Sequence, residues 1–258
     1  MEFYSRDKVY IRVITGVIFL LFLGVIGFNI FFDGINNFIS KIQVKYFMAP
    51  NFVVLLLYLI NILYLAGYTI IQLESSKYGM KKRVIDNYLF YPAFMFVFMG
   101  LNFHFILNDH YKLAATASVF YFLISVIIYY KAQRLRPYMY NDEVRAFLVP
   151  FANNLSWSLV LLFMSLNLMF ESMGSYESSA FRVTMAIVQL LFIIALCGFV
   201  LWIFTDKIFP INTLLYLVSV CASSYLNGYF MPVGYLYFLT IIVILVIIYK
   251  VNKAQKSK

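Results

Sequence analysis

The stretch that decides the fold is Pro150–Phe170, which reads PFANNLSWSLVLLFMSLNLMF. It is long enough to cross a bilayer, which takes about 20 residues of α-helix. Its first half nevertheless carries five side chains that form hydrogen bonds: Asn153, Asn154, Ser156, Trp157 and Ser158. A membrane helix does not gather so many polar groups unless neighbouring helices provide partners for them. The stretch therefore predicts a membrane helix around which the other apolar helices are arranged.

The composition of the 258-residue chain excludes an ordinary soluble domain. Hydrophobic residues make up 64% of the chain, charged residues 12%, and the mean hydropathy is +0.86. Soluble domains are about half apolar and about a quarter charged. The net charge of +9 comes from basic residues in short segments between apolar runs, a placement typical of membrane topology rather than of nucleic-acid binding. We therefore expect one polytopic transmembrane domain, residues 1–258, embedded in a lipid bilayer. We do not expect it to bind nucleic acid.

The apolar runs predict an all-α helical bundle with eight transmembrane helices. Each run is long enough for a hydrocarbon core of about 30 Å at about 1.5 Å per residue. The runs are Val13–Phe32, Phe52–Gln72, Tyr88–Leu107, Leu113–Tyr130, Pro150–Phe170, Val183–Phe204, Ile211–Leu226 and Val233–Tyr249. The seventh run is weakened by polar residues at its end, so seven helices is the alternative count.

The basic residues give an independent test of this count. With eight helices, alternate segments outside the membrane, including both termini, carry 16 Lys and Arg residues, whereas the other segments carry four. Basic residues accumulate on the cytoplasmic side of membrane proteins. The distribution therefore predicts that both termini are cytoplasmic, or on the equivalent side of an organelle, and leaves the identity of the membrane open.

Patterns for catalysis or for a cofactor are absent from the sequence. It has no Gly-rich phosphate loop, no Ser/His/Asp or Cys/His arrangement and no His-rich metal cluster. His104 and His110 flank Asn108 and Asp109, where helix capping or contact with interfacial water is a simpler interpretation than a metal site. Cys197 and Cys221 lie inside apolar runs and are expected to be small buried side chains. We therefore predict no enzyme, no cofactor and no metal.

Isolated polar residues occur in several other predicted helices. These are Asn29, Asn61, Asn102, Asn167 and Gln189. Each can bond to a neighbouring helix, which contributes about 0.6 kcal/mol on average. Together with the polar half of Pro150–Phe170 they could instead line a single cavity. The sequence leaves both interpretations open.

Two of the predicted helices resemble helices of a known family, the longer tryptophan-rich sensory proteins, which are relatives of the translocator protein (peripheral-type benzodiazepine receptor). One family helix begins with Thr-Pro-Ala-Gly-Tyr and ends with Ile-Tyr-Gln. The second predicted helix is similar to it, with Phe47-Met-Ala-Pro50-Asn-Phe at its start and Ile70-Ile-Gln72 at its end. Pro150-Phe-Ala-Asn-Asn-Leu-Ser-Trp157 resembles their Pro-Phe-Ser-Ile-Tyr-Leu-Gly-Trp, with the same interval from Pro to Trp. The chain departs from the family in having only two tryptophans, Trp157 and Trp202.

The resemblance implies a helical bundle with a pocket for a small planar or apolar ligand, such as a porphyrin or a sterol. Combined with the polar residues described above, it gives a set of candidate ligand-binding residues: Asn61, Asn102, Pro150, Asn153, Asn154, Ser156 and Trp157. The leading hypothesis is that the protein binds, transports or senses such a ligand. One alternative is a structural accessory subunit of a larger membrane complex or a homo-oligomer, and a second is a secondary transporter.

Overall fold

The computed structural model describes residues 9–33, 52–74, 85–88, 90–175, 178–226 and 233–256, and over these residues it is all-α, with no β-strand. Its main helices are α1 (Val9–Asp33), α3 (Phe52–Glu74), α5 (Tyr91–Leu107), α6 (Tyr111–Leu135), α8 (Val149–Ser172), α9 (Ser179–Phe204), α10 (Ile208–Leu226) and α11 (Val233–Lys256). Three short elements connect α6 to α8: η1 (Arg136–Tyr138), α7 (Asn141–Glu143) and the π-helix η2 (Val144–Leu148). Each of the eight apolar runs thus contains a helix.

Four stretches of helix are long and apolar enough, by length and composition, to cross a membrane. They are Val9–Phe28, Tyr111–Tyr138, Asn141–Ser172 and Ala180–Phe204. Four shorter apolar helices accompany them within the described residues: Tyr58–Leu73, Tyr91–Leu107, Ile208–Ala222 and Tyr235–Val251. The structure therefore supports a membrane protein built from helices.

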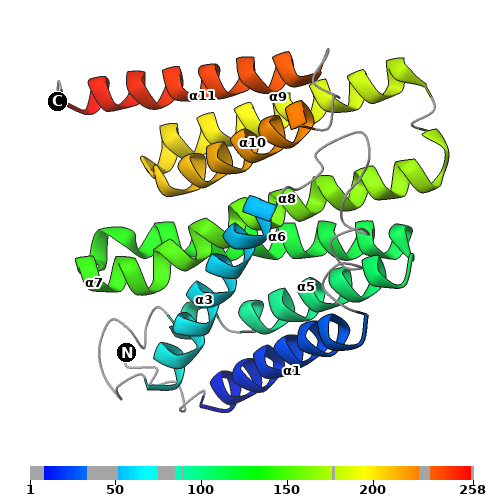
Figure 1. Cartoon of the computed structure of the whole chain (residues 1–258). Coiled ribbons are helices and arrows are strands. Elements are labelled where there is room, and N and C mark those ends of the chain that lie inside the picture. The colour runs from blue at the N-terminus through cyan, green and yellow to red at the C-terminus, as the bar shows by residue number, and fades with distance from the viewer. Residues whose placement is uncertain are drawn as a thin grey trace.

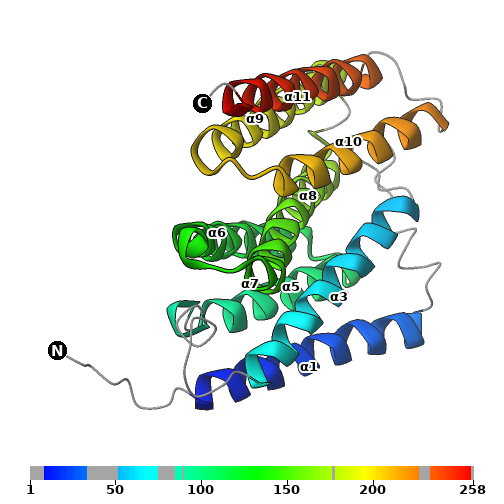
Figure 2. The same ribbon diagram turned by 90° about the vertical axis from the view of Figure 1, so that its left-hand side faces the viewer.

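Successive helices run back and forth, so that α1 begins and α11 ends at the same end of the bundle (Figure 1). Helix α3 crosses α1 obliquely, as the turned view shows (Figure 2). Polar contacts link several segments at this end: Arg12 to Asp86 at 3.3 Å, and Lys131 Nζ to the carbonyl of Asn87 at 2.9 Å. We name it the basic end.

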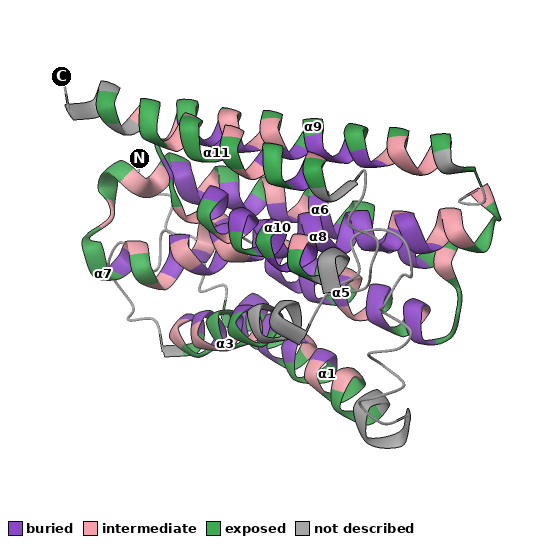
Figure 3. Cartoon of the chain, turned by 45° about the horizontal axis from the view of Figure 1, so that its top comes forward, coloured by how far each residue is buried: buried purple, intermediate pink, exposed green. Residues whose placement is uncertain are grey.

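Helix α8 lies at the centre of the bundle. It packs against α3, α6 and α10, and 17 of its 24 residues are buried, whereas the outer helices α1 and α9 expose many of their apolar side chains (Figure 3). A polar side chain on α8 therefore faces other helices rather than the surroundings of the bundle. This position confirms that the chain is organised around the Pro150–Phe170 stretch.

The structure modifies the predicted start of this helix. We expected Pro150 to begin it, because proline suits the first turn, where the backbone N–H has no helical partner. Pro150 does lie in the first turn of α8, but the π-helix η2 leads directly into it, with Val149 N–H donating to the carbonyl of Val144. Since Pro150 has no N–H for an ordinary helical bond to Ala146, the wider turn accommodates it without ending the helix.

Candidate functional site

Three of the predicted site residues meet in one hydrogen-bonded chain. Asn153 Nδ2 donates to Asn61 Oδ1 at 3.1 Å, and Asn61 Nδ2 donates to Asn154 Oδ1 at 3.3 Å. The chain continues on α10, where Asn212 Nδ2 donates to Asn153 Oδ1 at 2.8 Å. Asn61, Asn153, Asn154 and Asn212 are named the asparagine network below. It connects α3, α8 and α10 at their common junction.

Asn154 is the most highly bonded member of the network. Its Oδ1 also accepts a bond from the hydroxyl of Tyr121 at 2.6 Å. Its Nδ2 donates to Ser125 Oγ at 2.9 Å and to Met95 Sδ at 3.2 Å. The residue is completely buried, so these bonds extend the network to α5 and α6. Five helices are therefore joined through one side chain and its partners.

The arrangement of the network decides what it can do chemically. Both polar atoms of Asn154, and both of Asn61, are engaged by other protein groups. Buried polar groups that are bonded in this way stabilise a unique packing of helices. A ligand would have to replace these bonds before it could use the same atoms. The geometry favours contacts between helices over a cavity, and a ligand-binding role of these residues stays a prediction.

Trp157 and Ser156 lie one turn further along α8. The indole of Trp157 packs on the ring of Tyr58 with a centroid distance of 4.5 Å, and Tyr58 stacks on Phe103 at 5.1 Å. Within the described part of the chain, Trp157 Nε1 and the Tyr58 hydroxyl are buried without a hydrogen-bond partner. Ser156 Oγ donates to the carbonyl of Phe209 at 3.1 Å. Trp157 is thus held in an aromatic stack, and Ser156 connects α8 to α10.

Asn102 and Gln189 bond to partners outside the network. Asn102 Nδ2 donates to Ser165 Oγ at 2.8 Å and to the carbonyl of Ala114 at 2.9 Å. Gln189 Nε2 donates to Asn167 Oδ1 at 2.7 Å and links α9 to α8. The side chain of Asn29 is outside the described part of the structure. Asn102 therefore stabilises a separate contact between α5, α6 and α8.

His104, considered above as part of a possible metal site, has partners within its own turn. His104 is exposed, and its Nδ1 lies 3.3 Å from Asn108 Nδ2. Asp109 has a positive φ of 60° and accepts a bond from the Tyr111 hydroxyl at 2.6 Å. Among the described residues no group of three or more His, Cys, Asp or Glu side chains could hold a metal ion. These contacts fit an ordinary turn between α5 and α6.

A buried carboxylate at the basic end was not predicted. Asp206, in the turn between α9 and α10, is only 2% exposed. Its Oδ2 accepts bonds from the Tyr129 hydroxyl at 2.6 Å and from Gln133 Nε2 at 3.0 Å, and its Oδ1 accepts one from Ile208 N–H at 2.9 Å. Aspartate two residues before a helix is an N-terminal capping signal, and that signal could have identified it. The two bonds to α6 could not be read from the sequence.

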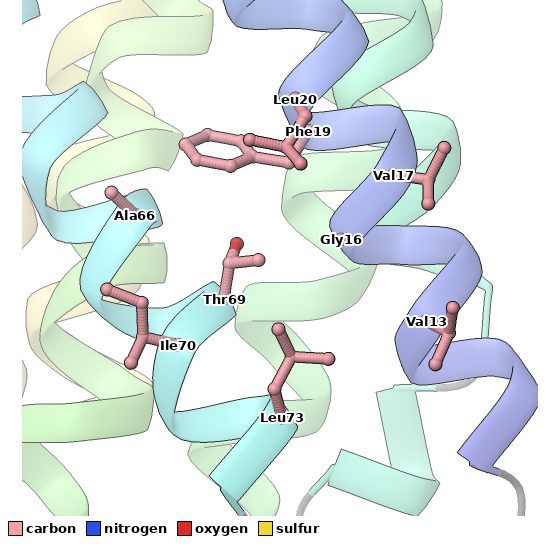
Figure 4. A pocket seen from close by; sticks show the side chains of 9 residues that line it. All are labelled: Val13, Gly16, Val17, Phe19, Leu20, Ala66, Thr69, Ile70 and Leu73. Atoms are coloured by element: carbon pink, nitrogen blue, oxygen red, sulfur yellow. The ribbon is translucent and has the colours of Figure 1, made fainter.

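An apolar groove of about 360 Å³ lies between α1 and α3 (Figure 4). One wall is formed by four residues of α1: Val13, Gly16, Val17 and Leu20. The other wall is formed by four residues of α3: Ala66, Thr69, Ile70 and Leu73. The ring of Phe19 lies between the two helices at one end of the groove. This groove was not predicted from the sequence, because apolar spacing alone does not show where two helices leave a space.

The fold and these sites define an all-helical protein whose long apolar helices suit a membrane. In comparisons with known proteins, no family model, no curated protein and no solved structure matches this chain. The resemblance to the tryptophan-rich sensory proteins therefore rests on the sequence motifs quoted above. Pro150–Trp157 lies at the start of α8 and Ile70–Gln72 near the end of α3, whereas residues 47–51 are outside the described residues.

Proposed function

We propose that the chain is an eight-span membrane protein with both termini on the cytoplasmic side or its organellar equivalent. Support comes from the alternating direction of the eight main helices and from the basic side chains gathered at one end. Exposed aromatic side chains on the outer helices add to it: Tyr10, Tyr130, Trp202 and Tyr249 lie near those ends of α1, α6, α9 and α11 that point to the basic end. Such residues concentrate at membrane–water interfaces. Cysteine accessibility at residues 2, 110 and 256 tests the topology, and labelling of residue 110 from the cytoplasm would contradict it.

We propose further that the protein binds a small apolar ligand, and that the groove between α1 and α3 is the binding site. The observation that carries this proposal is the groove itself. Its volume of about 360 Å³ is within the range of small-molecule sites, about 300 to 1,000 Å³. The Thr69 hydroxyl donates to the carbonyl of Leu65 within its own helix at 2.8 Å. The groove is therefore lined almost entirely by apolar side-chain atoms. Such a site selects an apolar molecule.

This proposal moves the binding site away from the polar half of α8. The asparagine network is engaged in contacts between helices, and we assign it the role of fixing those helices in place. The porphyrin or sterol implied by the family resemblance stays among the ligands to be tested. Ligand binding and the rigid centre of the bundle then share only α3, which contributes Asn61 to the network and residues 66–73 to the groove.

The groove permits a test with matched variants. A Cβ atom added at Gly16 would lie 3.7 Å from a methyl group of Leu73 inside the groove, whereas one added at Gly24, further along the same helix, has no atom within 4 Å. We expect that Gly16→Leu fills the groove and that Gly24→Leu leaves it open. Native mass spectrometry of protein purified in mild detergent should find an apolar molecule on wild type and Gly24→Leu that is absent from Gly16→Leu. The proposal fails if no molecule, co-purified or added, distinguishes the two variants.

A further inference from the structure

The shape of the groove carries more information than its volume. On α1 it is lined by positions 13, 16, 17 and 20, and on α3 by positions 66, 69, 70 and 73. Both rows follow the same spacing of i, i+3, i+4 and i+7, which marks one face of a helix over two turns. The groove is therefore a furrow that runs along the seam between the two helices. Seven residues of α-helix correspond to about 10 Å of length.

The furrow is longer than a compact pocket of the same volume would be. Its volume of about 360 Å³ extends along about 10 Å of two helices. A hydrocarbon chain can bend to follow such a seam, whereas the ring systems of a porphyrin and of a sterol are rigid. The elongated shape therefore favours a flexible chain.

The furrow is open along its side and closed at its base. Val13, Val17 and Leu20 on α1 are exposed on the outer face of the bundle, as are Ile70 and Leu73 on α3. The base includes the buried Thr69, and the buried Phe19 closes one end. In the proposed membrane orientation the open side faces the hydrocarbon of the bilayer. A ligand thus reaches the furrow sideways from the membrane and needs no route from water.

The two ends of the furrow differ in polarity. At the end formed by Val13 and Leu73, the neighbouring residues are Arg12, which pairs with Asp86 at 3.3 Å, and Gln72, whose Nε2 donates to the carbonyl of Arg12 at 3.0 Å. The opposite end is formed by Phe19 and Ala66 and is apolar. This gradient matches an amphipathic molecule with its headgroup at the basic end.

We infer that the furrow between α1 and α3 binds one acyl chain of a membrane lipid, with the headgroup beside Arg12 and Gln72 and the chain directed towards Phe19. This inference rests on the proposed function and narrows its ligand from small apolar molecules in general to a single-chain lipid segment. Length, lateral opening and the polarity gradient all agree with this ligand.

The experiment compares three added compounds on the same variants. Palmitoyl lysophosphatidylcholine, cholesterol and protoporphyrin IX are added at equal concentration to delipidated protein, and native mass spectrometry measures the fraction of protein that retains each. We expect wild type and Gly24→Leu to retain one palmitoyl lipid per chain, and Gly16→Leu to retain about tenfold less, which corresponds to about 1.4 kcal/mol. We expect cholesterol and protoporphyrin IX to show no such difference between variants.

A second pair of variants covers the case in which Gly16→Leu does not fold. Ala66→Leu fills the furrow from α3, and Gly67→Leu, at the adjacent position, adds a side chain where no atom lies within 4 Å of the new Cβ. If protoporphyrin or cholesterol is displaced by the filling variants and the palmitoyl lipid is not, the inference is overturned while the proposed function stands. If no compound distinguishes filling from control variants, both fail.

The orientation of the chain is tested separately. A lysolipid with a diazirine at the end of its acyl chain should crosslink near Phe19 and Ala66, and one with the diazirine beside the headgroup should crosslink near Val13 and Leu73. Crosslinks in the reverse order would overturn the assigned orientation.

Discussion

Removing the side chain of Asn154 is the sharpest test of the asparagine network. Asn154→Ala eliminates four contacts, those with Tyr121, Asn61, Ser125 and Met95. Hydrogen bonds between membrane helices contribute about 0.6 kcal/mol on average, so four of them predict a loss of about 2 kcal/mol in the free energy of unfolding. The stranded partners are buried and have no water to replace the bond, which makes this a lower estimate.

The assay can use a reporter that the chain already contains. Trp157 is 8% exposed, whereas Trp202, the other tryptophan, is 82% exposed. Unfolding in increasing mole fractions of sodium dodecyl sulfate should therefore change mainly the fluorescence of Trp157. Circular dichroism of the helices provides the second probe, and agreement of the two supports a two-state analysis.

Two further variants separate hydrogen bonding from other effects. Asn108→Ala removes an exposed asparagine that bonds only within its own turn, to His104, and should change the free energy of unfolding by less than about 0.5 kcal/mol. Asn154→Leu keeps the same branching at Cγ but cannot form hydrogen bonds, and should be destabilised nearly as much as Asn154→Ala. If Asn154→Ala matches Asn108→Ala, or if Asn154→Leu matches wild type, the network does not hold the helices together.

Substitutions at three further positions give testable changes in stability. Asn153→Ala removes two bonds of the network and should cost about 1 kcal/mol by the same unfolding assay, half of the Asn154→Ala effect. Trp157→Ala removes one ring of an aromatic stack and should lower the free energy of unfolding by about 3 kcal/mol. Trp157→Phe keeps an aromatic ring and removes an unpaired buried N–H. Its free energy of unfolding, measured by circular dichroism, should stay within about 1 kcal/mol of that of wild type. Asp206→Ala leaves Tyr129 and Gln133 without their acceptor and should cost about 3 kcal/mol. Asp206→Asn keeps an acceptor for Ile208 N–H and should cost clearly less in thermal unfolding.

The helices could be predicted from the sequence because hydropathy is a local property. Each apolar run contains a helix, and the differences lie at the ends. Helix α6 continues to Leu135 and α11 to Lys256, beyond the apolar residues Tyr130 and Tyr249, because Lys, Arg and Gln continue a helix readily once it has begun. The third run was predicted from Tyr88, but α5 starts at Tyr91, where Pro92 fits the first turn.

The polar partners were only partly predictable. Asn61, Asn153 and Asn154 stood out because amides are rare in apolar runs. Asn212, Tyr121 and Ser125 did not, because a residue near the start of a run, a tyrosine or a serine needs no special explanation in a membrane helix. Which residues meet depends on how the helices cross. Helix α8 is buried on nearly every side, and its polar side chains form hydrogen bonds with several neighbours. Its sequence therefore reveals that it is central without revealing which neighbour lies on which side.

The groove and the network occur in different places because buried hydrogen bonds hold some pairs of helices together and not others. A bonded amide in an apolar interior fixes the rotation of its helix, since turning the helix would leave the amide without a partner. Helices α3, α5, α6, α8 and α10 share such bonds. Helix α1 has none with the asparagine network: its polar contacts among the described residues gather around Arg12, at the basic end. Along the groove the side chains that α1 presents to α3 are apolar, and Gly16 contributes none. This is where two helices can separate enough to admit a hydrocarbon chain without breaking a buried hydrogen bond.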